Sequence, residues 1–589
     1  MKNFLKYVLA TITGIIIVSI LFMVVMLASL SVMMVSGDKT TSITDNSVLV
    51  LKAGVNIPDK GSKNPYSGID IINMTVTPAP GLNEILQNLK KAASDDKVKG
   101  VLIENGMIPP GWATTEELRD GLKKFRESGK FVIAWSDYLM IQEGYYLSAA
   151  ADKIYINPSS TVDFKGLSGE ILFYKKALEK LGVEVQVIRH GKFKGAVEPY
   201  ILDRLSPENR EQILTYVGSI WSHVLNNISA DRGIPVEKLN SIADNLTGYV
   251  AQGAFESGLV DGLLYHDQLI DTLKVRSGLT PDDKIALVPM HKYTKVPESK
   301  KTPFQKNKIS VVYASGSIVN GKGNENNIGG DAFRDVIRKE RKDSTVKAIV
   351  LRVNSRGGSA IASDMIWREL ELAAKDKPVV ISMGNYAASG GYFIAAPGTK
   401  VMASPTTITG SIGVFGLIPN TGKLMEQKLG VTYETVETNS NSDFPSVYRS
   451  MNTVEKEAMQ RSIEVIYSDF VNKVSAGRKM TFNEVDSIAQ GRVWSGSDAM
   501  RIGLVDSFGG LTDAVAEAGR LAGLEAWSLR ELPVSEDPFL KMISQFGAEI
   551  KNKILKNELG EFERIFDDLR EIRDFSGIQA RLPYYIELH

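Results

Sequence analysis

Three short segments of this chain combine residue types that could together break an acyl bond. Ser389 lies in the segment NYAASGGY, where small residues surround one hydroxyl after an apolar strand. Gly357 and Gly358 lie in NSRGGS, where glycines would let backbone N–H groups approach a substrate carbonyl. Lys194 lies in GKFKGAVEP, after the strand VEVQVI. A serine nucleophile with a lysine base is a recognised variant of the catalytic triad, so these segments favour acyl-transfer chemistry.

Each of these segments also has an ordinary structural explanation. A serine at a helix start is most often an N-cap, and paired glycines suit a plain strand-to-helix turn. Most lysines lie on a solvated face. For Lys194 to act as a base near neutral pH, its pKa must fall by about 3 units, which requires burial of the amine. An interface between two domains could bury it.

Composition removes several competing chemistries. The chain has no cysteine and only five histidines, none of them in a metal-binding helical pattern. We therefore expect no thiolate nucleophile, no metal site and no other cofactor, and little material exists for a Ser-His-Asp triad. The formal net charge is zero, so nothing in the composition indicates a nucleic-acid partner.

The chain contains the same unit of roughly 200 residues twice. Four landmarks recur in the same order at offsets of 245 to 248 residues. They are KGVLIE (99–104) and KAIVLR (347–352), GYYL (144–147) and GYFI (391–394), KLGV (180–183) and KLGV (428–431), and GLVD (258–261) and GLVD (503–506).

The two copies differ at the residues that could do chemistry. Gln142 stands in the first copy where the second has Ser389, and the second copy has Ser442 where the first has Lys194. The first copy also has two prolines, 109 and 110, at the place of the paired glycines, and proline has no N–H to donate. The sequence therefore predicts one active site shared between the copies, in which neither half works alone.

Both copies show the strand–helix–strand pattern of a parallel α/β fold. The predicted strands are 47–51, 98–104 and 131–134 in the first copy and 309–313, 348–353 and 379–383 in the second; the predicted helices are 115–128, 207–230, 363–375 and 454–477. The predicted segments are a cytoplasmic N-terminus (1–6), a transmembrane anchor (7–35), the repeat with the lysine (36–290), a linker (291–308), the repeat with the serine (309–525) and a helical tail (526–589).

The N-terminal segment 7–35 is a run of 29 residues without a formal charge. Lys2 and Lys6 precede the run, so the positive-inside rule places Met1 in the cytoplasm and the rest of the chain across the membrane. The alternative is a cleaved signal peptide, but the apolar part of a signal peptide has about 7–15 residues. The length of the run favours an uncleaved anchor.

Four motifs of the sequence resemble the signal peptide peptidase A family, also called protease IV, in its long two-domain form. The segments are YAASGGY (386–392), NSRGGS (354–359), KGAVEP (194–199) and TGSIG (409–413). The resemblance extends from the apolar N-terminal run to about residue 525. Arg356 departs from the pattern, since the family usually has proline there.

The resemblance implies a duplicated Clp-protease/crotonase-like α/β fold and a serine endopeptidase of the bacterial cytoplasmic membrane. It implies that Ser389 is the nucleophile, Lys194 the general base, Gly358 an oxyanion donor beside Gly390, and Ser411 the residue that orients the lysine. It also implies a homotetramer, catalytic domains on the periplasmic or outer side, and substrates that are signal peptides left in the membrane and other extended apolar peptides. A crotonase-type acyl-CoA enzyme and a decayed protease acting as a membrane scaffold are the two alternative hypotheses.

Overall fold

The computed structural model describes residues 6–7, 11–21, 43–54, 56–61, 69–70, 75–76, 80–297, 305–533 and 578–582. Most of the predicted anchor over 7–35 lies outside these residues; within it, residues 11–21 are helical and exposed. No helix among the described residues is long and apolar enough to cross a membrane.

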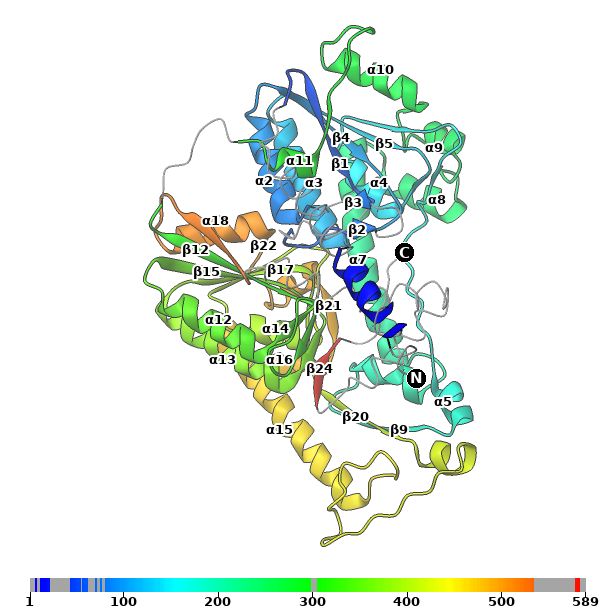
Figure 1. The fold of residues 1–589 in the computed structure, drawn as a ribbon, viewed down its shortest axis with the longest axis vertical. Helices are drawn as coiled ribbons and strands as arrows, with labels where there is room; N and C mark the ends of the chain where they lie inside the picture. The colour runs from blue at the N-terminus through cyan, green and yellow to red at the C-terminus, as the bar shows by residue number, and fades with distance from the viewer. Residues whose placement is uncertain are drawn as a thin grey trace.

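The first copy is built on a parallel sheet of six strands (Figure 1). In spatial order the strands are β11 (Leu287–Pro289), β1 (Ser47–Lys52), β4 (Val98–Glu104), β5 (Phe131–Ser136), β7 (Lys153–Ile156) and β10 (Gly262–Leu263). The helices that surround the sheet include α2 (Leu82–Ala93), α3 (Trp112–Arg126), α4 (Gln142–Ser148), α7 (Pro207–Arg232), α8 (Val236–Asn245), α9 (Ala251–Ser257) and α10 (His266–Arg276). β-Branched and leucine side chains of the central strands are buried, as expected for strands covered on both faces.

The second copy repeats this arrangement. Its strands run in the order β23 (Ser528–Leu532), β12 (Lys308–Ser315), β15 (Val346–Ser355), β17 (Val379–Ala388), β18 (Lys400–Ala403) and β22 (Ser507–Phe508), and all of these pairs are parallel. Its helices include α12 (Gly330–Lys342), α13 (Ala360–Asp376), α14 (Gly390–Ala395), α15 (Thr453–Arg478), α16 (Phe482–Ile488), α17 (Gly496–Arg501) and α18 (Leu511–Leu521). A branch of the sheet adds β19 (Ile408–Gly410) and β21 (Val493–Ser495) beside β17.

A third sheet joins the two copies, and the sequence pattern did not predict it. Its order is β14 (Asn327–Gly329), β13 (Ser317–Val319), β16 (Gly357–Ser359), β24 (Gln579–Arg581), β20 (Phe415–Asn420) and β9 (Glu184–Arg189). The strand β9 belongs to the first copy and pairs antiparallel with β20 of the second over six residues. Since Lys194 follows β9 closely, this pairing carries the lysine onto the second copy.

Two predicted segment boundaries need correction. The predicted linker starts at residue 291, but α11 (Met290–Tyr293) still packs on the first copy and Tyr293 is fully buried there. The predicted helical tail over 526–589 lies mainly outside the described residues, and its described parts form the strands β23 and β24. Both strands pair with the second copy, so hydrogen bonding to an existing sheet edge, rather than a periodic pattern, determines their structure.

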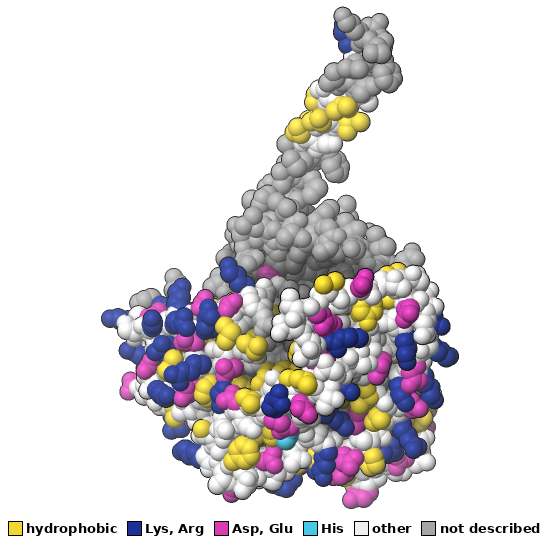
Figure 2. Space-filling view, turned by 90° about the horizontal axis from the view of Figure 1, so that it is seen from below, with side chains coloured by type: hydrophobic (Ala, Val, Ile, Leu, Met, Phe, Trp, Pro, Cys, Tyr) yellow, Lys and Arg dark blue, Asp and Glu magenta, His cyan; other side chains and the backbone are white. Residues whose placement is uncertain are grey.

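The outer surface is ordinary for a globular protein of zero net charge. On the face seen in Figure 2, Lys and Arg side chains are interspersed with Asp and Glu side chains over the described residues.

Candidate active site

Ser389 lies at the junction between β17 and α14. Its backbone has φ 56° and ψ −115°, an uncommon conformation for a residue with a side chain, and its N–H donates to the Gly410 carbonyl at 2.8 Å. The hydroxyl makes no capping hydrogen bond to α14, although Ser389 occupies the N-cap position. The side chain is therefore not used as a helix cap, which was the ordinary explanation for this serine.

Lys194 reaches Ser389 from the first copy. The Lys194 Nζ atom lies 2.8 Å from Ser389 Oγ, 3.0 Å from Ser411 Oγ and 3.1 Å from the Ser411 carbonyl oxygen. All three residues are fully buried. The structure thus brings together the serine, the lysine and the orienting serine that the sequence named from segments far apart in the chain.

Close backbone packing between the copies holds the lysine in place. Gly491 of the second copy has φ 85°, and a Cβ there would lie 2.6 Å from the Lys194 backbone nitrogen, so only glycine fits. The Gln212 side chain joins the two segments, because it donates to the Phe193 carbonyl and accepts from the Val493 N–H, both at 2.9 Å. These contacts fix the lysine from both sides of the interface.

Burial lowers the pKa of the Lys194 amine well below its usual value, because the charged form loses its hydration. Transferring an unpaired ammonium from water costs several kcal/mol, so burial favours the neutral form of the amine. A neutral amine has two N–H donors and one lone pair. Donation to the carbonyl and hydroxyl of Ser411 leaves the lone pair free to accept the Ser389 proton.

The paired glycines of NSRGGS lie directly beside the serine. Gly357 has φ 92°, and a Cβ on it would lie 2.7 Å from the Gly390 nitrogen, so the loop can approach α14 this closely only with glycine. Gly390 is the first residue of α14, and the first N–H groups of a helix have no helical acceptor. Gly357 of the loop and the Gly390 amide therefore lie side by side next to Ser389.

Arg356, which departs from the family's usual proline, lies against Tyr386. Its guanidinium carbon lies 4.2 Å from the centre of the tyrosine ring, within range of a cation–π interaction. Its carbonyl accepts from the Leu582 N–H at 2.7 Å. Arg356 therefore contributes a cation–π contact with Tyr386 beside the glycine loop.

The corresponding place in the first copy is filled by side chains. Gln142 accepts from the backbone N–H groups of Lys165 and Gly166, both at 2.9 Å, and donates to the Gly166 carbonyl at 3.0 Å. Its neighbour Glu143 is buried and accepts from the Gly111 N–H at 2.9 Å. The first copy thus has a closed structural site where the second has its serine.

Glu143 predicts a pH dependence of stability. Burial raises the pKa of its carboxyl to about 8, so the folded state keeps a proton that the unfolded state loses near pH 4.5. Stability attributable to this group therefore falls as the pH rises from about 4.5 to about 8. We expect Glu143→Gln to be more stable than the parent above pH 8, by roughly 1–3 kcal/mol in urea unfolding. The exposed Glu237→Gln is the control, and a gain as large for the control would contradict the assignment.

Asn385 contributes to the interface in a way that the sequence did not reveal. Its side-chain oxygen accepts from the N–H groups of Ala113 and Thr114 at 3.0 and 3.1 Å, and its amide donates to Thr114 Oγ1 at 3.0 Å. The strand that leads to Ser389 therefore caps the helix α3 of the first copy. The only sequence signal is a polar residue at the end of an apolar strand.

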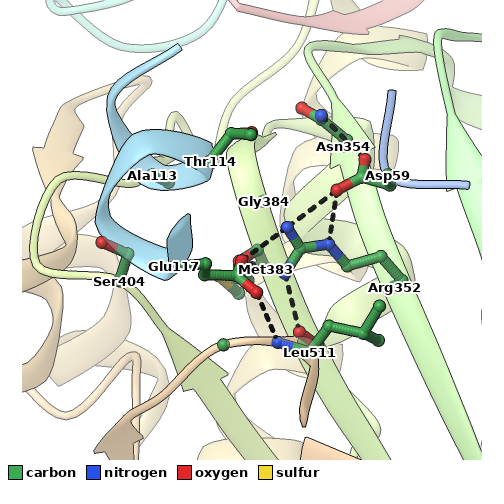
Figure 3. A network of polar contacts seen from close by, with 12 residues as sticks. Asp59, Ala113, Thr114, Glu117, Arg352, Asn354, Met383, Gly384, Ser404 and Leu511 are labelled. Atoms are coloured by element: carbon green, nitrogen blue, oxygen red, sulfur yellow. Dashed lines mark hydrogen bonds and ion pairs between the residues drawn. The ribbon is translucent and has the colours of Figure 1, made fainter. Parts of the chain in front are cut away.

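A buried ion network contacts Asn354, the first residue of the NSRGGS loop (Figure 3). Arg352 Nη2 lies 2.7 Å from Asp59 Oδ1 and 2.6 Å from Glu117 Oε1, and all three side chains are at most 5% exposed. Asp59 also accepts from the Asn354 amide at 2.9 Å, which ties the first residue of the loop to the first copy. The arginine interrupts the apolar strand AIVLRV, and a charge inside a buried strand is the signal that predicts a buried partner.

Within the described ranges, no three or more His, Asp or Glu side chains are grouped so that they could hold a metal ion.

Comparison with known proteins places the chain in a family. The profile described as peptidase family S49 matches it twice, at residues 124–280 and 371–525, and a Clp protease profile matches residues 301–409. The two matches to the S49 profile show the tandem duplication. The match to the Clp protease profile shows a Clp protease-like α/β fold.

Named relatives cover most of the chain. Protease 4 of Salmonella typhi is 39% identical over 76% of this chain and 73% of its own length. Protease 4 of Haemophilus influenzae is 34% identical over 82% of this chain and 80% of its own length. The chloroplastic serine protease SPPA of Arabidopsis thaliana is 31% identical over 85% of this chain and 74% of its own. Together with the buried serine and lysine, these matches show that the chain belongs to peptidase family S49, a family of serine proteases, and carries the family's domain twice.

Proposed function

We propose that this chain is a serine endopeptidase in which Ser389 and Lys194 form the catalytic dyad. One observation carries the proposal: a fully buried lysine amine lies 2.8 Å from a serine hydroxyl that caps no helix. A lysine on a solvated face would keep its proton and could not act as a base at neutral pH. If the chain were an acyl-CoA enzyme instead, its reaction would not explain why Lys194 is buried beside Ser389.

The reaction proceeds in two steps. Ser389 Oγ adds to the carbonyl carbon of an extended peptide while its proton passes to Lys194 Nζ, and the amides of Gly358 and Gly390 stabilise the oxyanion. The peptide C–N bond then breaks, and the lysine proton passes to the leaving nitrogen. Water, deprotonated by the same amine, hydrolyses the ester of Ser389 and restores the enzyme.

The setting of the enzyme is part of the proposal. The apolar segment 7–35 anchors the chain in the bacterial cytoplasmic membrane, with the catalytic domains on the periplasmic or outer side and the N-terminus in the cytoplasm. Extended apolar peptides, including signal peptides left in the bilayer after preprotein processing, are the substrates. The chain assembles as a homotetramer.

Covalent labelling tests the dyad directly. The purified full chain is incubated with a fluorophosphonate probe, and the modified residue is located by peptide mass spectrometry. We expect one major adduct, on Ser389, and no adduct in Lys194→Met, since the hydroxyl then has no proton acceptor. Ser442, at the first copy's lysine position, is the internal comparison and should stay unlabelled. Equal labelling of Ser389 with and without Lys194 would contradict the assigned base.

A further inference from the structure

A cavity of about 530 Å³ lies between the two copies. The helices α2 and α3 of the first copy line one part of it, and β12, α18 and β23 of the second copy line the rest (Figure 1). None of its described lining residues belongs to the segments NYAASGGY, NSRGGS or GKFKGAVEP. Pockets that hold small organic molecules have volumes of roughly 300–1,000 Å³ and often lie between domains. The cavity therefore has the size and the position of a ligand site distinct from the serine and the lysine.

Most of the surface that lines the cavity is apolar. Leucine, valine and alanine side chains contribute to it, together with the rings of Phe125, Tyr313 and Trp527. Phe125 and Tyr313 are buried, and Trp527 packs so closely on α18 that a Cβ on Gly519 would lie 2.6 Å from its indole ring. An apolar or aromatic body inside this space would be removed from water and would contact these rings.

The most buried part of the lining carries an excess of negative charge. Glu117 lines the cavity, and its side chain is 5% exposed. Its Oε1 atom lies 2.6 Å from Arg352 Nη2, but the same nitrogen lies 2.7 Å from Asp59 Oδ1 (Figure 3). Among the described residues, neither carboxylate pairs with a second cation. Two buried carboxylates thus share one guanidinium, and burial raises the pKa of Glu117 despite this pairing.

Glu531 adds another carboxylate to the lining. It accepts hydrogen bonds from the Asn83 amide at 2.7 Å and from the Tyr313 hydroxyl at 2.8 Å. Both donors are neutral, so they hold the carboxylate in place without compensating its charge.

The charged groups at the outer rim balance one another. Lys124 pairs with Asp513 at 3.6 Å, and these side chains are 63% and 44% exposed. Lys90 and Asp120, which also line the cavity, are exposed as well. Two lysines and two aspartates at the rim have no net formal charge. The excess negative charge therefore belongs to the buried end of the cavity.

We propose that this cavity binds a small organic cation, with its ammonium group facing Glu117 and its apolar body against the aromatic rings. Carboxylates compensate an ammonium charge, and aromatic faces attract it. An anion would add to the excess charge, and a neutral apolar molecule would leave it uncompensated. A metal ion needs several oxygen ligands around it, and the described residues contain no cluster of three or more His, Asp or Glu side chains that could hold one.

The occupant would bind the docked arrangement of the two copies. Because α2 and α3 come from the first copy and α18 from the second, the cavity exists only when the copies lie against each other. A ligand that binds only the folded, docked state stabilises that state by mass action. The site is independent of the proposed catalytic dyad, since it uses none of its residues.

Isothermal titration calorimetry of the full chain in lipid nanodiscs tests the site, with empty nanodiscs as the blank. The probes are phenylbutylamine, phenylbutanol and phenylbutyrate, which share one apolar body and differ in charge. At neutral pH we expect the amine to bind with a Kd below about 1 mM, the alcohol at least about tenfold more weakly, and the carboxylate not at all. Thermal unfolding should show a higher Tm with the amine than with either of the other probes.

Three variants locate the site. Ala516→Trp places a large ring in the cavity from an exposed position on α18 and should weaken amine binding by at least about tenfold. Ala230→Trp makes the same change on the exposed face of α7 and should bind the amine as the parent does. Glu117→Gln removes the negative charge and should reduce the preference for the amine over the alcohol to about threefold or less.

Each of the other outcomes would overturn the proposal. Binding of the alcohol as tightly as the amine would remove the role of the charge. Amine binding that Ala516→Trp leaves unchanged would place the ligand elsewhere, and the absence of binding by all three probes would leave the cavity without this function. Peptide turnover, measured without probes on the same preparations, tests the proposed dyad separately, so its failure would not affect the ligand site.

Discussion

Replacing Lys194 by methionine is expected to lower kcat/KM for an extended peptide by about 10⁴-fold while the protein stays folded. Methionine has a similar length and fills the same buried space without a proton acceptor, so Ser389 loses its base but the interface keeps its packing. Ser389→Ala should cause a loss of similar size. Because the two residues act as one unit, the double variant should be no worse than either single variant.

The matched control is Lys192→Met, two residues away on an exposed side chain. It makes the same chemical change and should leave kcat/KM within about twofold of the parent, because an exposed lysine contributes little. Far-UV circular dichroism and thermal unfolding check that the variants fold. A Lys194→Met protein that is folded and cleaves at more than a tenth of the parent's rate would remove the lysine from the mechanism.

The pH dependence gives a second readout of the same residue. The pKa of Lys194 is lowered by burial, and the neutral amine is the active form, so kcat/KM should rise with pH through that pKa and then level. The unfolded chain holds this proton up to about pH 10.4. Between the lowered pKa of the folded state and about pH 10.4, unfolding therefore takes up a proton, and the free energy of unfolding contributed by this group rises with pH over that range. Lys194→Met should lack this contribution.

Arg352→Met is expected to cause the largest loss of stability, about 3–5 kcal/mol. The change leaves the carboxylates of Asp59 and Glu117 buried without their cation, in a site where both are at most 5% exposed. Because Asp59 also holds the Asn354 amide, the start of the glycine loop should loosen, and kcat should fall together with stability. Urea unfolding and peptide turnover measure the two effects.

A surface arginine provides the comparison. Arg368 pairs with Glu371, and the two side chains are 57% and 26% exposed, so Arg368→Met should cost less than about 1 kcal/mol. Replacing Arg352, Asp59 and Glu117 together by apolar residues should recover much of the lost stability, because no unpaired charge then remains buried. If Arg352→Met cost no more than Arg368→Met, the network would not hold the copies together.

The repeat made much of this site predictable. Comparing the two copies identified Ser389, which has no counterpart serine in the first copy, and Lys194, which has no counterpart lysine in the second. The strand–helix pattern predicted β4, β15 and β17 within a few residues. Long, strongly periodic elements such as α7 and α15 are also where sequence patterns are most informative, because one helix face must be buried along the whole length.

The contacts between the copies were not predictable in the same way. A three-residue strand such as β24 has no periodicity, and its structure depends on the free edges of β16 and β20, which come from elsewhere in the chain. The pairing of β9 with β20 joins residues more than 200 positions apart. Asn385 and Arg352 were visible as polar residues in apolar strands, but only the fold shows which partners satisfy them.

The pairing of β9 with β20 also sets the order in which activity can arise during synthesis. Domains fold from the N-terminus as the ribosome adds residues, and pairings distant in sequence form late. When the first copy has been made, its lysine strand has no partner, because Phe415–Asn420 has yet to be translated. A ribosome that stalls or terminates early therefore releases a chain without peptidase activity, and a truncated messenger yields no unregulated protease.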